Sequence, residues 1–199
     1  MSGSFPVIEK EKTMIHHPEL IRRLEAGNAA YRNALRLEGD VSPALRRLSA
    51  EQGQQPYAIV ICCSDSRVIP EAIFSAGIGE LFVIRVAGNV LDRHQLGSIE
   101  YAAAHLECGV IVLLGHTGCG AVSAALSGGG DGFIRYITDD ILEAIGEERD
   151  PLLACELNVR HGTAAIRAAF AEHPELGADT LDVLGAVYDI ASGEVRWLT

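Results

Sequence analysis

Residues 57–62 read Tyr-Ala-Ile-Val-Ile-Cys, an apolar run rich in strand-forming residues, and residues 63–67 follow as Cys-Ser-Asp-Ser-Arg. Similar apolar runs occupy residues 81–86 and 110–114. A strand that is apolar on both faces is typical of a parallel sheet buried between two layers of helices. The three runs therefore predict an α/β fold built on a central, mostly parallel sheet.

Helical segments alternate with these runs. Residues 96–106 and 118–126 are predicted to be helices, and Asp150 followed by Pro151 is typical of the start of a third, with a capping aspartate and a proline in the first turn. The expected buried stripe of that helix is Leu152, Val159, Ile166 and Phe170. Alternation of strands and helices favours a sheet flanked by helices on both faces.

Both ends of the chain carry recognisable patterns. Between residues 16 and 37 the spacing of apolar residues predicts an N-terminal helix. Its expected buried stripe is Leu20, Leu24, Tyr31 and Leu35. Near the other end, a strand-like run over residues 181–190 turns at Ser192 and Gly193 into residues 195–198, which predicts an antiparallel strand at the edge of the sheet.

The chain is expected to form a single domain over residues 1–199. It is 48% apolar, which is enough to bury a full core at this length. Residues 1–50 are expected to form an N-terminal helical arm, and residues 55–199 an α/β core that carries the metal site described below.

The overall charge limits the partners of the chain. A formal net charge of −11 argues against binding to nucleic acid or to an anionic membrane surface. The first ten residues lack the apolar region of a secretion signal, and no apolar run is long enough to cross a bilayer, so we expect a cytoplasmic protein. Five cysteines, an odd number, indicate reduced thiols rather than a disulfide framework.

The residues that follow the three runs can bind a metal. Cys63 follows the first run, and His116 and Cys119 follow the third. Ligands in open α/β sheets bind beyond the carboxyl ends of the strands, where these side chains are expected to meet if the two strands are neighbours. Two thiolates and one imidazole suit zinc, and three protein ligands leave a fourth position open, as in catalytic zinc sites.

A lone His-x-x-Cys pair is weak evidence, because buried cysteines are common core residues. Asp65 and Arg67 strengthen it, since a charged pair at the mouth of an apolar sheet is costly to desolvate and so is more easily explained by function than by stability. The remaining cysteines, Cys62, Cys108 and Cys155, are interpreted as core or helix-face thiols.

Other functions fit the same segments less well. Cys63 as a nucleophile with His116 as its base would suit thiol or phosphoryl chemistry, but Arg67 lies too close to Cys63 to close a phosphate-binding loop. Residues 115–120 form a glycine-rich turn, but their glycines do not fall in the dinucleotide-binding order and no lysine follows them. A non-catalytic domain stabilised by zinc stays open as an alternative.

Four motifs, in this order, resemble those of the β-class carbonic anhydrases. They are Cys-x-Asp-x-Arg at 63–67, Arg-x-Ala-Gly-Asn at 85–89, Ser-Ile-Glu-Tyr-Ala at 98–102 and Gly-His-x-x-Cys-Gly at 115–120. The resemblance extends from residues 24–28 to residues 185–190, nearly the whole chain.

This resemblance implies reversible hydration of carbon dioxide to bicarbonate and a proton, by attack of a zinc-activated hydroxide. It also implies one zinc ion per chain, a sheet of four parallel strands plus an antiparallel edge strand, and a homo-oligomer with a dimer as its minimal unit. A related zinc hydrolase acting on carbonyl sulfide or carbon disulfide is the alternative enzyme.

Residue by residue, the resemblance assigns Cys63, His116 and Cys119 as zinc ligands. Asp65 and Arg67 match the catalytic pair beside the metal. Held by Arg67, Asp65 would orient the attacking hydroxide; released, it is a possible fourth zinc ligand in a closed state.

Two further positions are assigned to substrate binding. Gln54 matches a glutamine that contacts substrate in many members; the alternative is a solvated loop residue. Gly118 is the second residue assigned to substrate binding. Members regulated by bicarbonate have a tryptophan where this chain has Val60, which argues against such regulation here. His94 is a candidate proton shuttle, with an ordinary surface histidine as the alternative.

Overall fold

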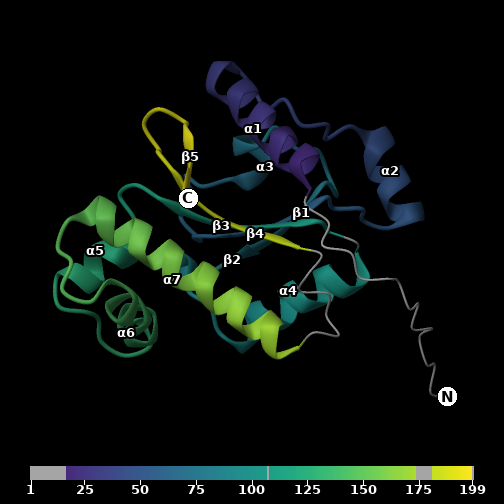
Figure 1. Ribbon diagram of the computed structural model, residues 1–199. Helices are drawn as coiled ribbons and strands as arrows, with labels where there is room; N and C mark the ends of the chain where they lie inside the picture. Colours follow the sequence, from purple (N-terminus) through teal and green to yellow (C-terminus); the bar gives the residue numbers. More distant parts are fainter. Residues whose placement is uncertain (1–16, 107, 174–180, 199) are drawn as a thin grey trace.

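A five-stranded sheet forms the centre of the computed structural model, which describes residues 17–106, 108–173 and 181–198 (Figure 1). The strands are β1 (Ala58–Cys62), β2 (Leu81–Arg85), β3 (Val110–His116), β4 (Asp182–Tyr188) and β5 (Val195–Leu198). Their order is β2-β1-β3-β4-β5, and only β5 runs antiparallel to its neighbour. The expected sheet of four parallel strands with an antiparallel edge is confirmed.

The central position of β1 and β3 explains their sequences. Every residue of both strands is buried, because each has a strand on either side and protein over both faces. Cys62 pairs with Leu114, so the two strands end nearly level with each other. This register places the residues that follow β1 beside the end of β3, as a shared site requires.

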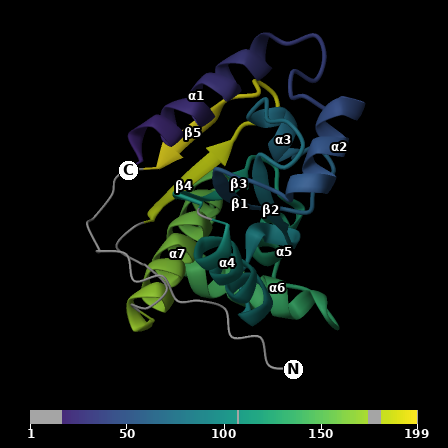
Figure 2. The ribbon, with the colours of Figure 1, turned by 90° about the vertical axis from the view of Figure 1, so that its right-hand side faces the viewer.

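Helices cover both faces of the sheet (Figures 1 and 2). The helices are α1 (Pro18–Asn33), α2 (Pro43–Gln52), α3 (Pro70–Ile73), the 3-10 turn η1 (Ala87–Asn89), α4 (Arg93–His105), α5 (Gly120–Leu126), α6 (Ile134–Ile145) and α7 (Pro151–Glu172). Leu24 of α1 and Phe74 after α3 pack on one face, while Ile99 of α4 and Val159 of α7 pack on the other. None of the helices that the structure describes is long and apolar enough to cross a membrane.

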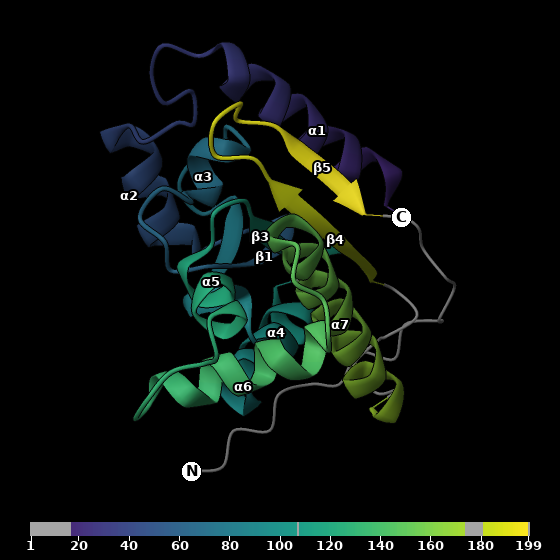
Figure 3. The same cartoon turned by 90° about the vertical axis from the view of Figure 1, so that its left-hand side faces the viewer.

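A third apolar cluster lies at the carboxyl ends of the strands. Val122 of α5 and Ile141 of α6 pack there with Ala154 of α7, next to Cys63 and Cys119. Figure 3 shows α5 and α6 together at this end of the molecule, with α7 beside them. The cluster shields the candidate site from one side.

Two details of the predicted helices are wrong. Leu35 is fully exposed, because α1 ends at Asn33 and the chain turns extended at Ala34. Leu152 lies on the same side of α7 as the buried residues but is 44% exposed, because the first buried residue of this helix is Ala154. In both cases the apolar spacing in the sequence extends beyond the part of the helix that other elements cover.

Candidate metal centre

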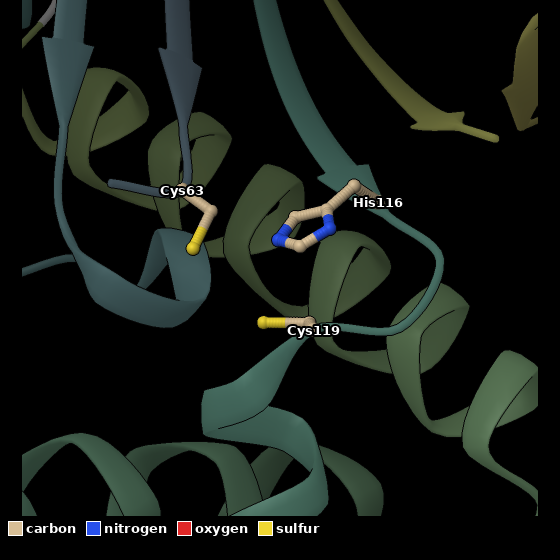
Figure 4. Close-up of side chains that lie close together, drawn as sticks. All are labelled: Cys63, His116 and Cys119. Carbon is tan, nitrogen blue, oxygen red and sulfur yellow. The ribbon is translucent and has the colours of Figure 1, made fainter. Parts of the chain in front are cut away.

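Three metal-binding side chains converge beyond the ends of β1 and β3. Cys63 directly follows β1, His116 is the last residue of β3, and Cys119 is the N-cap of α5. All three are buried, and their ligand atoms lie within 4.8 Å of one another. Figure 4 shows both sulfur atoms and one ring nitrogen pointing into a common space. Among the residues that the structure describes, no other group of three metal-binding side chains is placed this way.

The histidine meets the requirement of a metal ligand. Its Nδ1 lies 3.0 Å from the carbonyl oxygen of Thr117, and its Nε2 is buried with no hydrogen-bond partner among the described residues. If Nδ1 donates to that carbonyl, Nε2 keeps its lone pair free for a metal. A buried nitrogen without a partner is costly, and a bound cation would remove that cost. The donor set therefore fits zinc.

The two thiols lie close together, and each shifts the pKa of the other in opposite directions. The neighbouring Cys119 thiol, with His116, lowers the pKa of Cys63 to about 4, and the backbone N–H groups of Asp65 and Gly88 donate hydrogen bonds to its sulfur at 3.4 and 3.3 Å. The same pairing, together with burial, raises the pKa of Cys119. The surroundings of Cys63 thus favour its thiolate, the form in which cysteine binds a metal.

Asp65 and Arg67 form a bidentate ion pair beside these ligands. Arg67 Nε lies 2.9 Å from Asp65 Oδ1, and Nη2 lies 2.7 Å from Oδ2. These hydrogen bonds hold the pKa of Asp65 well below its usual range. Both carboxylate oxygens are engaged, and Asp65 is not part of the metal-binding group, so in this conformation it is not placed as a fourth ligand.

Gly118 lies next to this pair. Its carbonyl oxygen accepts a hydrogen bond of 3.3 Å from Arg67 Nη2. Its φ of +65° is a left-handed conformation that favours glycine, and a Cβ there would meet no atom within 4 Å. The residue therefore lies at an open place beside the Asp65–Arg67 pair.

Gln54 is not brought to this site within its own chain. It precedes β1, whereas Cys63 follows it, and a strand of five residues separates the two ends by roughly 17 Å at about 3.3 Å per residue. The side chain is exposed. His94 lies in the first turn of α4, where its side chain is exposed and its Nδ1 lies 3.6 Å from Asp92 Oδ1.

The other cysteines are core thiols, as expected. Cys62, Cys108 and Cys155 are buried, and burial raises their pKa values to about 12, 11 and 11. Cys62 faces the opposite layer of the sheet from Cys63, because successive side chains of a strand alternate. It therefore does not compete for the metal site in this register.

Arg85 is a residue whose contribution the sequence did not reveal. Its Nη2 donates to the carbonyl oxygen of Asp65 at 2.7 Å, and its Nε donates to that of Cys63 at 3.4 Å. Arg85 thereby braces the backbone of the loop that carries a candidate ligand and the candidate catalytic carboxylate. Its position at the end of β2 suggested a place near the site. The sequence could not show that Arg85 donates to backbone carbonyl oxygens, because no pattern of residue types identifies such acceptors.

Known proteins with similar sequences and structures share one description. A family model described as carbonic anhydrase matches residues 58–195. A carbonic anhydrase of Mycolicibacterium smegmatis is 38% identical over 162 residues, which cover 76% of this chain and 79% of that protein.

Solved structures agree. A β-carbonic anhydrase of Aspergillus fumigatus has a TM-score of 0.66 and 29% identity, with 91% of this chain and 89% of that chain covered. A match described as tetrameric β-carbonic anhydrases of Sordaria macrospora has a TM-score of 0.60 and 31% identity, with 91% and 94% covered.

Proposed function

This chain belongs to the β-class carbonic anhydrase family, and from that premise we propose that it works with one zinc ion held by Cys63, His116 and Cys119. Its activity is that of a carbonate dehydratase, the reversible hydration of carbon dioxide. The observation that best supports the zinc site is the convergence of two buried thiols on the unpartnered Nε2 of His116. Bound zinc would supply the Lewis acidity that lets a water molecule lose its proton near neutral pH.

Asp65 is proposed to orient the reacting water. Its lowered pKa keeps the carboxylate ionised at neutral pH, so it can accept a hydrogen bond and direct a lone pair of the water oxygen toward carbon dioxide. Arg67 holds both carboxylate oxygens and so prevents Asp65 from turning onto the metal. Arg67 is thus the residue that keeps the site open.

Gly118 is proposed to leave space for the substrate beside this pair. Its missing Cβ and its carbonyl bond to Arg67 keep that side of the site open and fixed. A larger side chain would narrow the approach to Asp65.

A dimer is proposed as the minimal unit, since Gln54 can contact substrate only at the site of a second copy. Exposed apolar side chains in the same N-terminal part of the chain, Leu35, Leu37 and Val41, support this interface, because a partner would bury them. Relatives described as tetrameric also support assembly.

The proposal is tested by measuring zinc content and stopped-flow carbon dioxide hydration on the same samples. Wild type is expected to hold one zinc per chain and to hydrate carbon dioxide rapidly, and Cys119→Ser to lose both. Cys108→Ser is the matched control, because Cys108 is an equally buried thiol that donates to the Pro56 carbonyl oxygen, away from the metal group. Wild type without zinc, or full activity in Cys119→Ser, would overturn the proposal.

A further inference from the structure

We propose that Asn158 is a positioning residue for the metal centre, acting through Gly88 on the sulfur of Cys63. The inference rests on the proposed role of Cys63 as a zinc ligand. It concerns a helix residue that follows Cys63 by almost a hundred positions and does not touch the sulfur itself.

The contacts form a buried chain from α7 to the thiolate. Asn158 is 5% exposed, and its Nδ2 donates to the Gly88 carbonyl oxygen at 2.8 Å. The N–H of Gly88 in turn donates to Cys63 Sγ at 3.3 Å. Both hydrogen bonds are shielded from water, so each is directional and strong.

Gly88 needs an anchor because its backbone conformation is unusual. It has a φ of +70°, and an added Cβ would lie 2.9 Å from Ile141 Cδ1 and 3.0 Å from Ala121 Cβ. The turn is therefore pressed between α5 and α6, and its carbonyl is held in place by the Asn158 amide. Losing that bond would leave a buried carbonyl unsatisfied and favour a change in the backbone dihedral angles of Gly88. Because the Gly88 N–H lies in the preceding peptide, on the other side of its Cα, such a change would also turn that N–H away from the sulfur.

The same face of α7 also supports a second ligand. Cys155 lies three residues before Asn158, hence on the same side of the helix, and its Sγ donates to the His116 carbonyl oxygen at 3.2 Å. α7 thus contacts backbone next to ligands that come from two different strands. A rigid helix that reaches both is suited to fix the distance between them.

A hydrogen bond to a metal-bound thiolate has two effects. It fixes the direction of the sulfur lone pairs, and it withdraws negative charge from the sulfur. Loss of such an outer contact typically weakens metal binding by about 10- to 100-fold. It also raises the energy of the sulfur lone pairs, which moves a sulfur-to-metal charge-transfer band to longer wavelength.

The test compares two substitutions at Asn158 with one control on the same helix. Asn158→Leu removes the amide, and a cavity of about 120 Å³ beside Asn158 gives room for the branched side chain. Asn158→Asp keeps the shape but places an acceptor opposite the Gly88 carbonyl. Thr163→Val is the control, because Thr163 is equally buried but its hydroxyl donates to the Arg160 carbonyl oxygen within the same helix.

Zinc affinity is measured by chelator competition, and the absorption spectrum is recorded after substitution with cobalt(II). Both Asn158 variants are expected to bind zinc about 10- to 100-fold more weakly and to show the cobalt charge-transfer band at longer wavelength. Thr163→Val is expected to match wild type in both measurements. Circular dichroism shows which variants are folded, and only folded variants are compared with wild type. Asn158→Asp is the variant closer in shape to the native side chain.

The outcomes separate this inference from the proposed function. Wild type that binds neither zinc nor cobalt would overturn the proposed function itself. Wild type that binds both, with a folded Asn158 variant of unchanged affinity and unchanged band, would overturn the positioning role alone.

Discussion

Arg67 binds both oxygens of the Asp65 carboxylate in a parallel, bidentate arrangement, with Nε to Oδ1 at 2.9 Å and Nη2 to Oδ2 at 2.7 Å. A planar guanidinium fits a carboxylate in this way, which a lysine cannot reproduce. The arrangement holds the pKa of Asp65 well below its usual range and engages both of its oxygens, and Asp65 is not part of the metal-binding group. In the proposed mechanism, the orientation of this carboxylate decides whether the fourth metal position is open or closed.

Replacing Arg67 by alanine is expected to abolish most activity while zinc stays bound. Asp65 would lose its anchor and become free to misalign or to bind the metal, and we expect kcat/KM to fall by roughly 10²-fold, as for other small misplacements of a reacting group. Stopped-flow hydration and metal analysis on the same sample check this. Arg135→Ala is the control, since Arg135 is an exposed arginine paired with Asp139 on α6. Loss of zinc from Arg67→Ala would instead make Arg67 a structural support.

Activity is expected to rise from neutral toward alkaline pH. Two thiolates cancel the formal charge of zinc, so the water that it activates is less acidic than at a site of three neutral histidines. The lowered pKa of Asp65 means that its ionisation is complete well below neutral pH, and it contributes no rise in this range. The measurement is kcat/KM for hydration at a series of pH values between neutral and alkaline. A flat or falling profile would contradict the argument.

Removing the metal is expected to lower stability. The proposed zinc would hold together Cys63 after β1, His116 of β3 and Cys119 at the start of α5, and only in the folded chain. Such binding stabilises the fold by about 4 kcal/mol when free zinc is a thousandfold above its dissociation constant. A chelator should therefore lower the midpoint of thermal unfolding in wild type and in Cys108→Ser. In Cys119→Ser the chelator should have little effect. Equal responses in all three proteins would mean that the metal does not bridge these elements.

Substitution of Gly88 by alanine is expected to destabilise the fold. The left-handed backbone and the close contacts with Ile141 and Ala121 together should cost about 2 kcal/mol or more. Gly97→Ala is a control of opposite sign, because Gly97 lies inside α4 and an added Cβ meets no atom within 4 Å. That variant should gain about 0.5–1 kcal/mol. Chemical denaturation measures both, and a neutral Gly88→Ala would show that the turn can relax.

The sheet and the Cys63–His116–Cys119 cluster were predictable because their determinants are local. The runs over residues 58–62 and 110–114 are apolar at every position, Cys63 directly follows the first, and His116 and Cys119 lie within five residues of the end of the second. The support of the site was not predictable in the same way. Asn158 and Gly88 are separated by 70 residues, and they meet only because of how α7 crosses the end of the sheet.

The last prediction concerns Gln54 and tests whether the active site is formed by one chain or shared by two. Gln54 lies before β1 and the metal group lies after it, so a substrate contact requires the Gln54 of another copy. Gln54→Ala and Arg67→Ala are each expected to reduce hydration, the first less than the second. In a symmetric dimer, a hybrid of the two variants would contain one site with an intact Arg67 and an intact Gln54 from the other chain. Mixing the variants under conditions that exchange subunits should therefore raise activity above the average of the two variants measured alone. If Gln54 acted within its own chain, or had no role, the hybrid would contain no newly completed site, and the mixture would show only the average activity of its two components.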